Sequence, residues 1–135
     1  MRRELRAWLF GTIVVIVACL IGYGWQAQRE QRRIAQQSVL LTHGNPQRGP
    51  SAIAHYRCGG CHDIPSVTGA QGTIGPPLAQ FGGRAYIAGE RRNTPENLIA
   101  WIMHPHAIEP KTAMPEMAVT ETDARDIAAY LYTLN

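Results

Sequence analysis

The pattern of hydrophobic and polar positions divides the 135-residue chain into an apolar N-terminal run and a longer stretch of mixed character. Residues 7–25 are mostly apolar and carry no charge. As a helix they would extend over about 28 Å, close to the thickness of the hydrocarbon core of a bilayer. Trp8, Tyr23 and Trp25 lie near the ends of this run, where aromatic side chains favour the membrane interface. The pattern predicts a single membrane-spanning helix within an N-terminal anchor of residues 1–28.

Two other interpretations of this segment stay open. A secretory signal peptide also has a basic start, but its apolar stretch is usually shorter and ends at a small-x-small cleavage site. Residues 25–27, Trp-Gln-Ala, match such a site poorly. Residues 16–19 resemble the bacterial lipobox, in which Cys19 would be acylated, although the apolar run continues past this cysteine. We therefore favour a retained anchor over cleavage or lipidation, with Cys19 as a lipid-facing residue.

The positions that follow the apolar run are mainly polar and predict a helical stalk. Residues 26–41 contain neither Gly nor Pro and consist largely of helix-favouring types. Residues 42–46, Thr-His-Gly-Asn-Pro, end this helix with a linker signal. We therefore expect a stalk and linker over residues 29–45 and a folded domain over residues 46–135.

Three short helices are predicted in the folded domain. The first covers residues 51–57, after a proline that suits the first turn of a helix. The second follows the N-cap residue Thr94 and continues up to Pro105. The third begins at Thr120, which forms a capping box with Asp123. No segment shows a convincing two-residue alternation of apolar and polar positions, so we expect an all-α fold without a significant sheet.

A long irregular loop separates the first two of these helices. It is rich in glycine and proline, at Pro65, Gly69, Gly72, Gly75, Pro76, Pro77, Gly82 and Gly83. Such a loop is unusual in a small domain unless something else organises it. Three short helices also bury little apolar surface for a domain of roughly 90 residues. The sequence therefore predicts a large apolar group at the centre of the domain.

The basic excess of the chain is confined to its N-terminal quarter. The whole chain has 13 Lys and Arg residues against 10 Asp and Glu residues. Residues 1–33 contain six arginines and two glutamates, whereas residues 34–135 contain seven basic and eight acidic residues. Nucleic-acid binding would need a basic stripe on the folded part, and this distribution excludes one. The arginines bracket the predicted span, three on each side, so the positive-inside rule does not decide its orientation.

Residues 58–62, Cys-Gly-Gly-Cys-His, form the C-x-x-C-H attachment signature of a c-type haem. The two cysteines are one helical turn apart and can both form thioethers with one porphyrin, while His62 can ligate its iron. C-x-x-C alone could also be a redox dithiol, but the sequence around it shows no βαβ pattern. A structural zinc site would need four ligands. A Cys₂His₂ zinc site would have to take its two histidine ligands from His55, His62, His104 and His106. We predict one covalent haem c, held by Cys58 and Cys61.

A haem iron that is bound by one histidine needs a sixth ligand or keeps an open site. The candidates are Met103, Met114, Met117, His104 and His106. Met103 lies at helical spacing with apolar neighbours, which favours core packing, and the two histidines flank a proline at a helix exit, which favours the surface. Met114 precedes Pro115 in a loop, where an extended backbone is preferred. We expect Met114 as the ligand and Met117 as the alternative, because a loop can approach the haem face opposite His62. Thioether ligation raises the reduction potential, which suits electron transfer.

Residues 46–135 resemble class I monohaem cytochromes c. The segments that carry the resemblance are 45–49 (Asn-Pro-Gln-Arg-Gly), 58–62, 75–78 (Gly-Pro-Pro-Leu), 113–115 (Ala-Met-Pro) and 126–131 (Asp-Ile-Ala-Ala-Tyr-Leu). The resemblance implies a small all-α fold wrapped around one covalent haem, with the Pro76 carbonyl accepting a hydrogen bond from His62. It also implies that the first and last helices cross, with Gly49 and Tyr130 at the contact.

The resemblance further implies a location and a function. Residues 86–98 are similar to cytochrome domains that accompany or are fused to bacterial terminal oxidases. Haem attachment in the family occurs outside the bacterial cytoplasm, which implies a single-pass inner-membrane protein with a periplasmic haem domain. We expect an electron carrier, not an enzyme, between a quinol-oxidising complex and a terminal oxidase. A fixed haem subunit of a respiratory oxidase or dehydrogenase is the alternative, and a haem peroxidase is less favoured.

Overall fold

The computed structural model describes residues 2–135, and within them all side chains except those of residue 2 and residues 5–7. The chain divides into two compact units, one that ends at Arg33 and one that covers Ile34–Asn135. The predictions about the anchor that concern Met1 and the side chains of Arg2, Arg6 and Ala7 lie outside the described residues.

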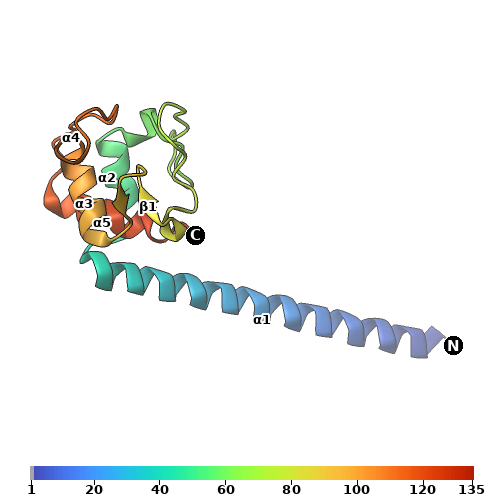
Figure 1. The fold of residues 1–135 in the computed structure, drawn as a ribbon. Helices are drawn as coiled ribbons and strands as arrows, with labels where there is room; N and C mark the ends of the chain where they lie inside the picture. Colours follow the sequence, from blue (N-terminus) through green and yellow to red (C-terminus); the bar gives the residue numbers. More distant parts are fainter. Residues whose placement is uncertain (1) are drawn as a thin grey trace. The chain divides into compact units, whose positions relative to one another are not determined.

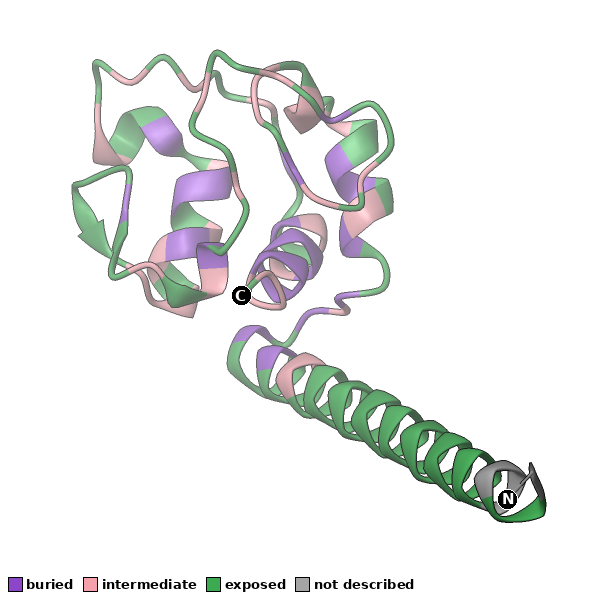
Figure 2. Ribbon diagram, turned by 90° about the vertical axis from the view of Figure 1, so that its right-hand side faces the viewer, coloured by how far each residue is buried: buried purple, intermediate pink, exposed green. Residues whose placement is uncertain are grey.

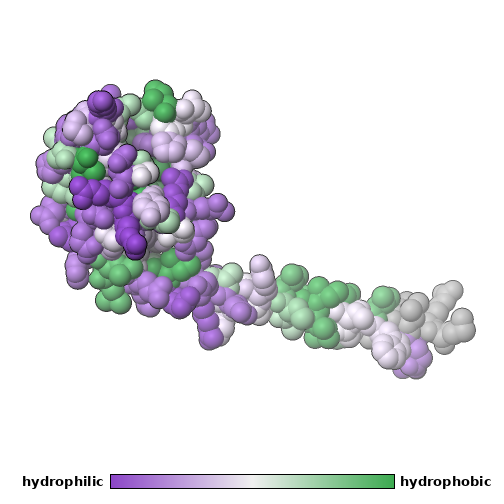
Figure 3. Space-filling view, in the orientation of Figure 1, coloured by the Kyte–Doolittle hydropathy of each residue, from purple (hydrophilic) through white to green (hydrophobic). Residues whose placement is uncertain are grey.

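Helix α1 (Arg2–Thr42) is one continuous element of 41 residues (Figure 1). It contains a stretch long and apolar enough to cross a membrane, the one such helix in the part of the chain that the structure describes. Large apolar side chains from Trp8 to Trp25 are exposed and form the apolar part of the helix surface (Figure 3). The helix continues without a break from the apolar run through the polar residues that follow it, up to Thr42. An exposed apolar surface of this length suits a bilayer rather than water.

The C-terminal end of α1 is fastened within the second unit. Thr42 is buried, and its hydroxyl donates to a carbonyl one turn earlier at 2.7 Å. His43 then adopts a left-handed conformation with φ 55°, which ends the helix where the linker signal predicts. The backbone N–H of Asn45 donates to the carboxylate of Asp126 at 2.6 Å. The second unit therefore begins at Ile34, inside the segment that the sequence assigns to the stalk.

The second unit is mainly helical, and the expected all-α class is confirmed. After α1 its elements are α2 (Gly49–His55), the 3₁₀ turns η1 (Cys58–Gly60) and η2 (Phe81–Gly83), the strands β1 (Tyr86–Ile87) and β2 (Arg91–Arg92), and the helices α3 (Pro95–Met103), α4 (Pro105–Ile108) and α5 (Glu121–Leu131). The two strands form a small antiparallel hairpin in which Tyr86 pairs with Arg92. The pattern does not predict this hairpin, because strands of two residues are too short to show an alternation.

The helix ends follow local chemistry that the sequence shows. The hydroxyl groups of Thr94 and Thr120 each accept the backbone N–H three residues on, at 3.3 and 3.2 Å. These are the predicted N-caps of α3 and α5. Helix α3 ends at Met103, short of the predicted end, because Pro105 disfavours a helical backbone at the residue before it. Pro105 then opens the short helix α4, which the sequence pattern does not predict.

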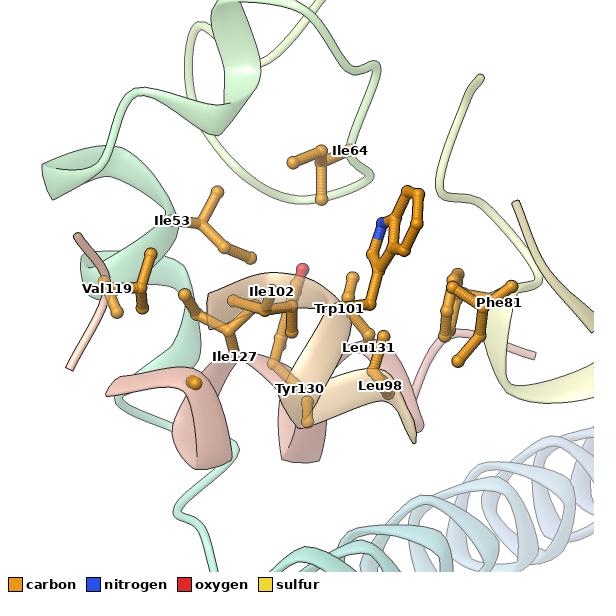
Figure 4. Packing of buried hydrophobic residues seen from close by; sticks show 14 of the residues in the cluster. Ile53, Ile64, Phe81, Leu98, Trp101, Ile102, Val119, Ile127, Tyr130 and Leu131 are labelled. Atoms are coloured by element: carbon orange, nitrogen blue, oxygen red, sulfur yellow. The ribbon is translucent and has the colours of Figure 1, made fainter. Parts of the chain in front are cut away.

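Helix α5 lies at the centre of the second unit, in contact with both α2 and α3. Figure 2 shows its long buried surface, and Figure 4 shows Ile53, Ile102 and Ile127 pointing toward one another from α2, α3 and α5. A Cβ atom on Gly49 would collide with the Tyr130 side chain, so the absence of a side chain at this position permits the close crossing. The expected contact between the first and last helices of the domain is therefore confirmed.

Candidate functional site

The two cysteines and the histidine at 58–62 lie in a tight turn that directly follows α2. Helix α2 ends two residues before Arg57, which adopts a left-handed conformation with φ 56°. The predicted helix over 51–57 is therefore too long at its end. The N–H groups of Cys61 and His62 both donate to the Cys58 carbonyl, at 3.1 and 3.0 Å. Both thiols are half-buried and free of disulfides, and burial raises the pKa of the Cys58 thiol.

The imidazole of His62 is oriented by the loop that follows the turn. Its Nδ1 atom lies 2.8 Å from the carbonyl oxygen of Pro76. A carbonyl oxygen can only accept, so Nδ1 carries the proton and Nε2 keeps a lone pair that can bind a metal. A Cβ atom on Gly75 would lie 2.6 Å from Nδ1, so the ring packs directly against the Gly75 backbone. The N–H of Gly75 donates to the Cys61 carbonyl at 2.7 Å, which fastens this loop to the turn.

Three side chains that the sequence analysis does not single out support the loop around Pro76. The Arg84 guanidinium donates to the Pro77 carbonyl and, at 3.1 Å, to a second carbonyl two residues on. The Asn93 amide donates to the Arg84 carbonyl at 3.0 Å, and the Tyr132 hydroxyl donates to the Asn93 side chain at 2.9 Å. Burial raises the pKa of Tyr132 to about 12, so its hydroxyl stays protonated. These contacts join distant segments, and no spacing in the sequence indicates them.

The chain between α4 and α5 contains two candidate methionine ligands. Met114 and Met117 are both half-buried and pack against the hydrophobic core. Met103 lies on α3 and packs against the same core, as its helical spacing suggests. His104 and His106 are exposed. Burial together with a loop position therefore favours Met114 and Met117 over the two histidines as iron ligands.

The groups that the turn at 58–62 and the loop before α5 supply are those that a covalently attached haem needs. They comprise two half-buried thiols in one turn, an imidazole with an available Nε2 and a thioether from a separate loop. The Cys₂His₂ zinc alternative is not supported, because no three His, Cys, Asp or Glu side chains among the described residues gather closely enough to hold a metal ion. A redox dithiol is not supported either, because in the described part of the chain the strands form only the β1–β2 hairpin and no βαβ unit surrounds the two cysteines.

Comparison with known proteins points the same way. The family model described as Cytochrome c matches residues 46–135. Cytochrome c oxidase subunit 2 of Alkalihalophilus pseudofirmus is 35% identical over 88 residues, which cover 64% of this chain and 25% of that protein. Subunit 2 of Bacillus sp. PS3 is 34% identical over 87 residues (62% and 24%), and that of Bacillus subtilis 28% over 107 residues (75% and 29%). The chain thus spans about a quarter of the length of these relatives. No solved structure matches the chain significantly.

Proposed function

The chain belongs to the cytochrome c family, and from this premise we propose that it is a membrane-tethered carrier that passes single electrons towards a terminal oxidase. The family binds covalent haem c, and Cys58 and Cys61 fit the attachment motif, so the domain is an electron-transfer domain. The observation that carries the proposal for the site is the bond between His62 Nδ1 and the Pro76 carbonyl. This bond leaves Nε2 available beside two thiols.

We assign the following roles to the residues of the site. Cys58 and Cys61 hold the haem through thioethers, His62 supplies the fifth ligand and Met114 the sixth. The Pro76 carbonyl fixes the tautomer of the imidazole and, by accepting a hydrogen bond from Nδ1–H, increases the basicity of Nε2. When bound, haem c supplies a one-electron couple between ferric and ferrous iron. If His62 and Met114 both bound the iron, they would leave no position for a substrate, which favours a carrier over a peroxidase.

The proposed organisation comprises an anchor over residues 1–28, a stalk and linker over 29–45 and a cytochrome domain over 46–135. The span at residues 7–25 is supported by the exposed apolar surface of α1, and the start of the domain agrees with the first residue of the family match. We propose a bacterial inner-membrane location with the haem domain in the periplasm, since haem attachment in the family occurs outside the cytoplasm.

The proposed redox partners are a quinol-oxidising complex as donor and a terminal oxidase as acceptor. The relatives that support the second partner are themselves subunits of cytochrome c oxidases. The same observation supports a second candidate function, a fixed haem subunit of a respiratory oxidase or dehydrogenase complex. Mild detergent extraction separates the two functions: a fixed subunit co-purifies with the complex, whereas a carrier elutes alone.

The test of the assigned ligands is the absorption spectrum of the full-length oxidised protein. We expect a low-spin spectrum with a methionine–iron charge-transfer band that is lost in Met114→Ala and kept in Met103→Ala, a matched half-buried methionine. Loss of the band in Met117→Ala alone would transfer the ligand role to Met117. A high-spin spectrum with rapid peroxide turnover would contradict the carrier function.

A further inference from the structure

The loop that presents the proposed sixth ligand has few polar ties to the rest of the domain. Within the described part of the chain, no backbone–backbone hydrogen bond involves residues 113–119. The Met114 N–H donates only locally, to the Thr112 hydroxyl at 3.2 Å. The half-buried Met114 and Met117 and the buried Val119 supply the apolar packing of this segment. The position of the ligand therefore depends on whatever side chains fasten the loop.

One carboxylate, that of Glu116, provides such a fastening. Its Oε2 atom lies 3.7 Å from His104 Nδ1, and its Oε1 atom lies 3.7 Å from His106 Nδ1. Oε1 also accepts the backbone N–H of His106, at 3.4 Å. The two histidines flank Pro105 at the corner between α3 and α4, where the buried proline ring holds the backbone in place. The carboxylate thus joins the methionine loop to a fixed corner of the fold.

We propose that Glu116 is the positioning residue of the axial methionine, and that with His104 and His106 it forms a clamp that keeps the loop closed. The inference rests on the proposed methionine ligation, and it applies to Met114 and to Met117 because Glu116 lies between them. The clamp does not touch the iron. It acts by lowering the population of a state in which the loop has opened and the thioether has left its position.

The physical basis is that a weak contact can control a local opening. At 3.7 Å each imidazole forms an ion pair with the carboxylate only when it is protonated, and such an exposed pair changes an equilibrium by only a small factor. Opening of this loop breaks the proposed thioether–iron bond, loses the packing of three apolar side chains and breaks the clamp. The equilibrium factors of these contributions multiply, so loss of the clamp alone raises the open population by the clamp's own factor. An external ligand that binds only the open state has an apparent affinity proportional to that population.

The experiment is an imidazole titration of the full-length oxidised protein, with displacement of the methionine–iron charge-transfer band as the signal. We expect Glu116→Ala to bind imidazole about three- to tenfold more tightly than the wild type, as the loss of two or three weak contacts implies. The reduction potential should fall in the same variant, because a methionine ligand that leaves more often stabilises the ferrous state less. The matched control is Glu90→Gln, which removes one exposed carboxylate on the hairpin between β1 and β2.

A second variant decides the matter if Glu116→Ala fails to fold. The double substitution His104→Ala/His106→Ala removes both imidazole contacts and should tighten imidazole binding by a smaller factor than Glu116→Ala, because the bond from the His106 backbone N–H to Glu116 remains. Adding Glu116→Ala should then give only the gain that this remaining bond accounts for. Equal imidazole affinity in the wild type, both clamp variants and Glu90→Gln would overturn the clamp and leave the ligation intact. A wild-type protein without the charge-transfer band would instead overturn the proposed ligation.

Discussion

The Nδ1 atom of His62 lies 2.8 Å from the carbonyl oxygen of Pro76, and this bond determines which ring nitrogen faces a metal. The bond exists because the chain before Pro76 comes close to the ring without a side chain in between. Gly75 occupies that position, and a Cβ atom there would lie 2.6 Å from Nδ1 and 3.0 Å from Nε2. The availability of Nε2 therefore depends on a glycine as well as on the histidine.

The substitution Gly75→Ala should displace the imidazole or the loop that carries Pro76. We expect the free energy of unfolding to fall by about 1–3 kcal/mol, the usual cost of a forced repacking, and the reduction potential to shift. Both are measured on the full-length protein, by chemical denaturation and by redox titration. The control is Gly83→Ala, outside the attachment segment, since a Cβ at Gly83 would have no protein atom within 4 Å. If both variants behave alike, the close approach at Gly75 is not required.

The attachment of haem through Cys58 and Cys61 is tested by extraction with acidified organic solvent. A thioether-bound haem stays with the polypeptide, whereas a haem held only by its axial ligands is extracted. We expect the double variant Cys58→Ser/Cys61→Ser to lose its haem and Cys19→Ser to retain it. Cys19 is the third free cysteine of the chain and lies in α1. Retention of haem by the double variant would contradict the assigned attachment.

A pH dependence follows from the N-cap of α5. The carboxylate of Asp123 accepts hydrogen bonds from the Tyr56 and Thr120 hydroxyl groups, both at 2.8 Å, and these bonds hold its pKa below the ordinary value. A carboxyl whose pKa is lower in the folded state stabilises the fold above its unfolded-state pKa, near 4. That contribution is lost as the pH falls through the folded-state pKa.

Tyr56→Phe removes the Tyr56 hydrogen bond, which lowers the pKa of Asp123 more than the Thr120 hydrogen bond does. We expect the variant to be less stable than the wild type at pH 7, and the difference in free energy of unfolding to shrink as the pH falls below about 4. Urea denaturation at a series of pH values measures this difference. Tyr86→Phe is the control, because Tyr86 is exposed on β1. A difference between Tyr56→Phe and wild type that stays constant with pH would show that the bond to Asp123 is not its origin.

Features that depend on neighbouring residues could be predicted from the sequence. The N-caps at Thr94 and Thr120 are examples, because a hydroxyl reaches the N–H three residues on within one helical turn. The Cys58–His62 segment is another, since its chemistry depends on spacing alone. The break after α2 escaped prediction because the left-handed backbone of Arg57 has no signal in a residue type that normally avoids it.

Features that depend on distant contacts could not be predicted in the same way. The second unit begins at Ile34 rather than at the expected domain boundary. One cause is the bond between Asn45 and Asp126, which are 81 residues apart. The hydrogen bonds from Tyr132 to Asn93 and from Asn93 to Arg84 also join residues that are distant in the sequence. Hydrophobic periodicity indicates which face of a helix is buried, but it does not identify the distant residues with which the polar groups of that helix form hydrogen bonds.

The buried carboxylate of Asp126 should be the main polar fastening between α5 and the segment that follows α1. Its side chain is 3% exposed and accepts the Asn45 N–H at 2.6 Å and the Arg48 guanidinium at 2.7 and 3.1 Å. Asp126→Asn keeps the shape but places an amide donor among these donors. Because Arg48 is largely exposed and can be rehydrated, we expect a cost of about 1–3 kcal/mol rather than the full penalty of an isolated buried charge.

Urea denaturation of the full-length protein gives this cost, and limited trypsin digestion shows where the fold has loosened. Cleavage after Arg48 should be faster in Asp126→Asn, because the guanidinium and the preceding backbone lose their shared partner. Glu30→Gln is the matched control: it also removes a carboxylate paired with an arginine, at 2.8 Å from Arg33, but at an exposed position on α1. Exposed pairs contribute about 0–1 kcal/mol. If Asp126→Asn costs no more than Glu30→Gln, the segment after α1 is held by packing and by other bonds, such as that from Arg125 to the Thr42 carbonyl, and not by this carboxylate.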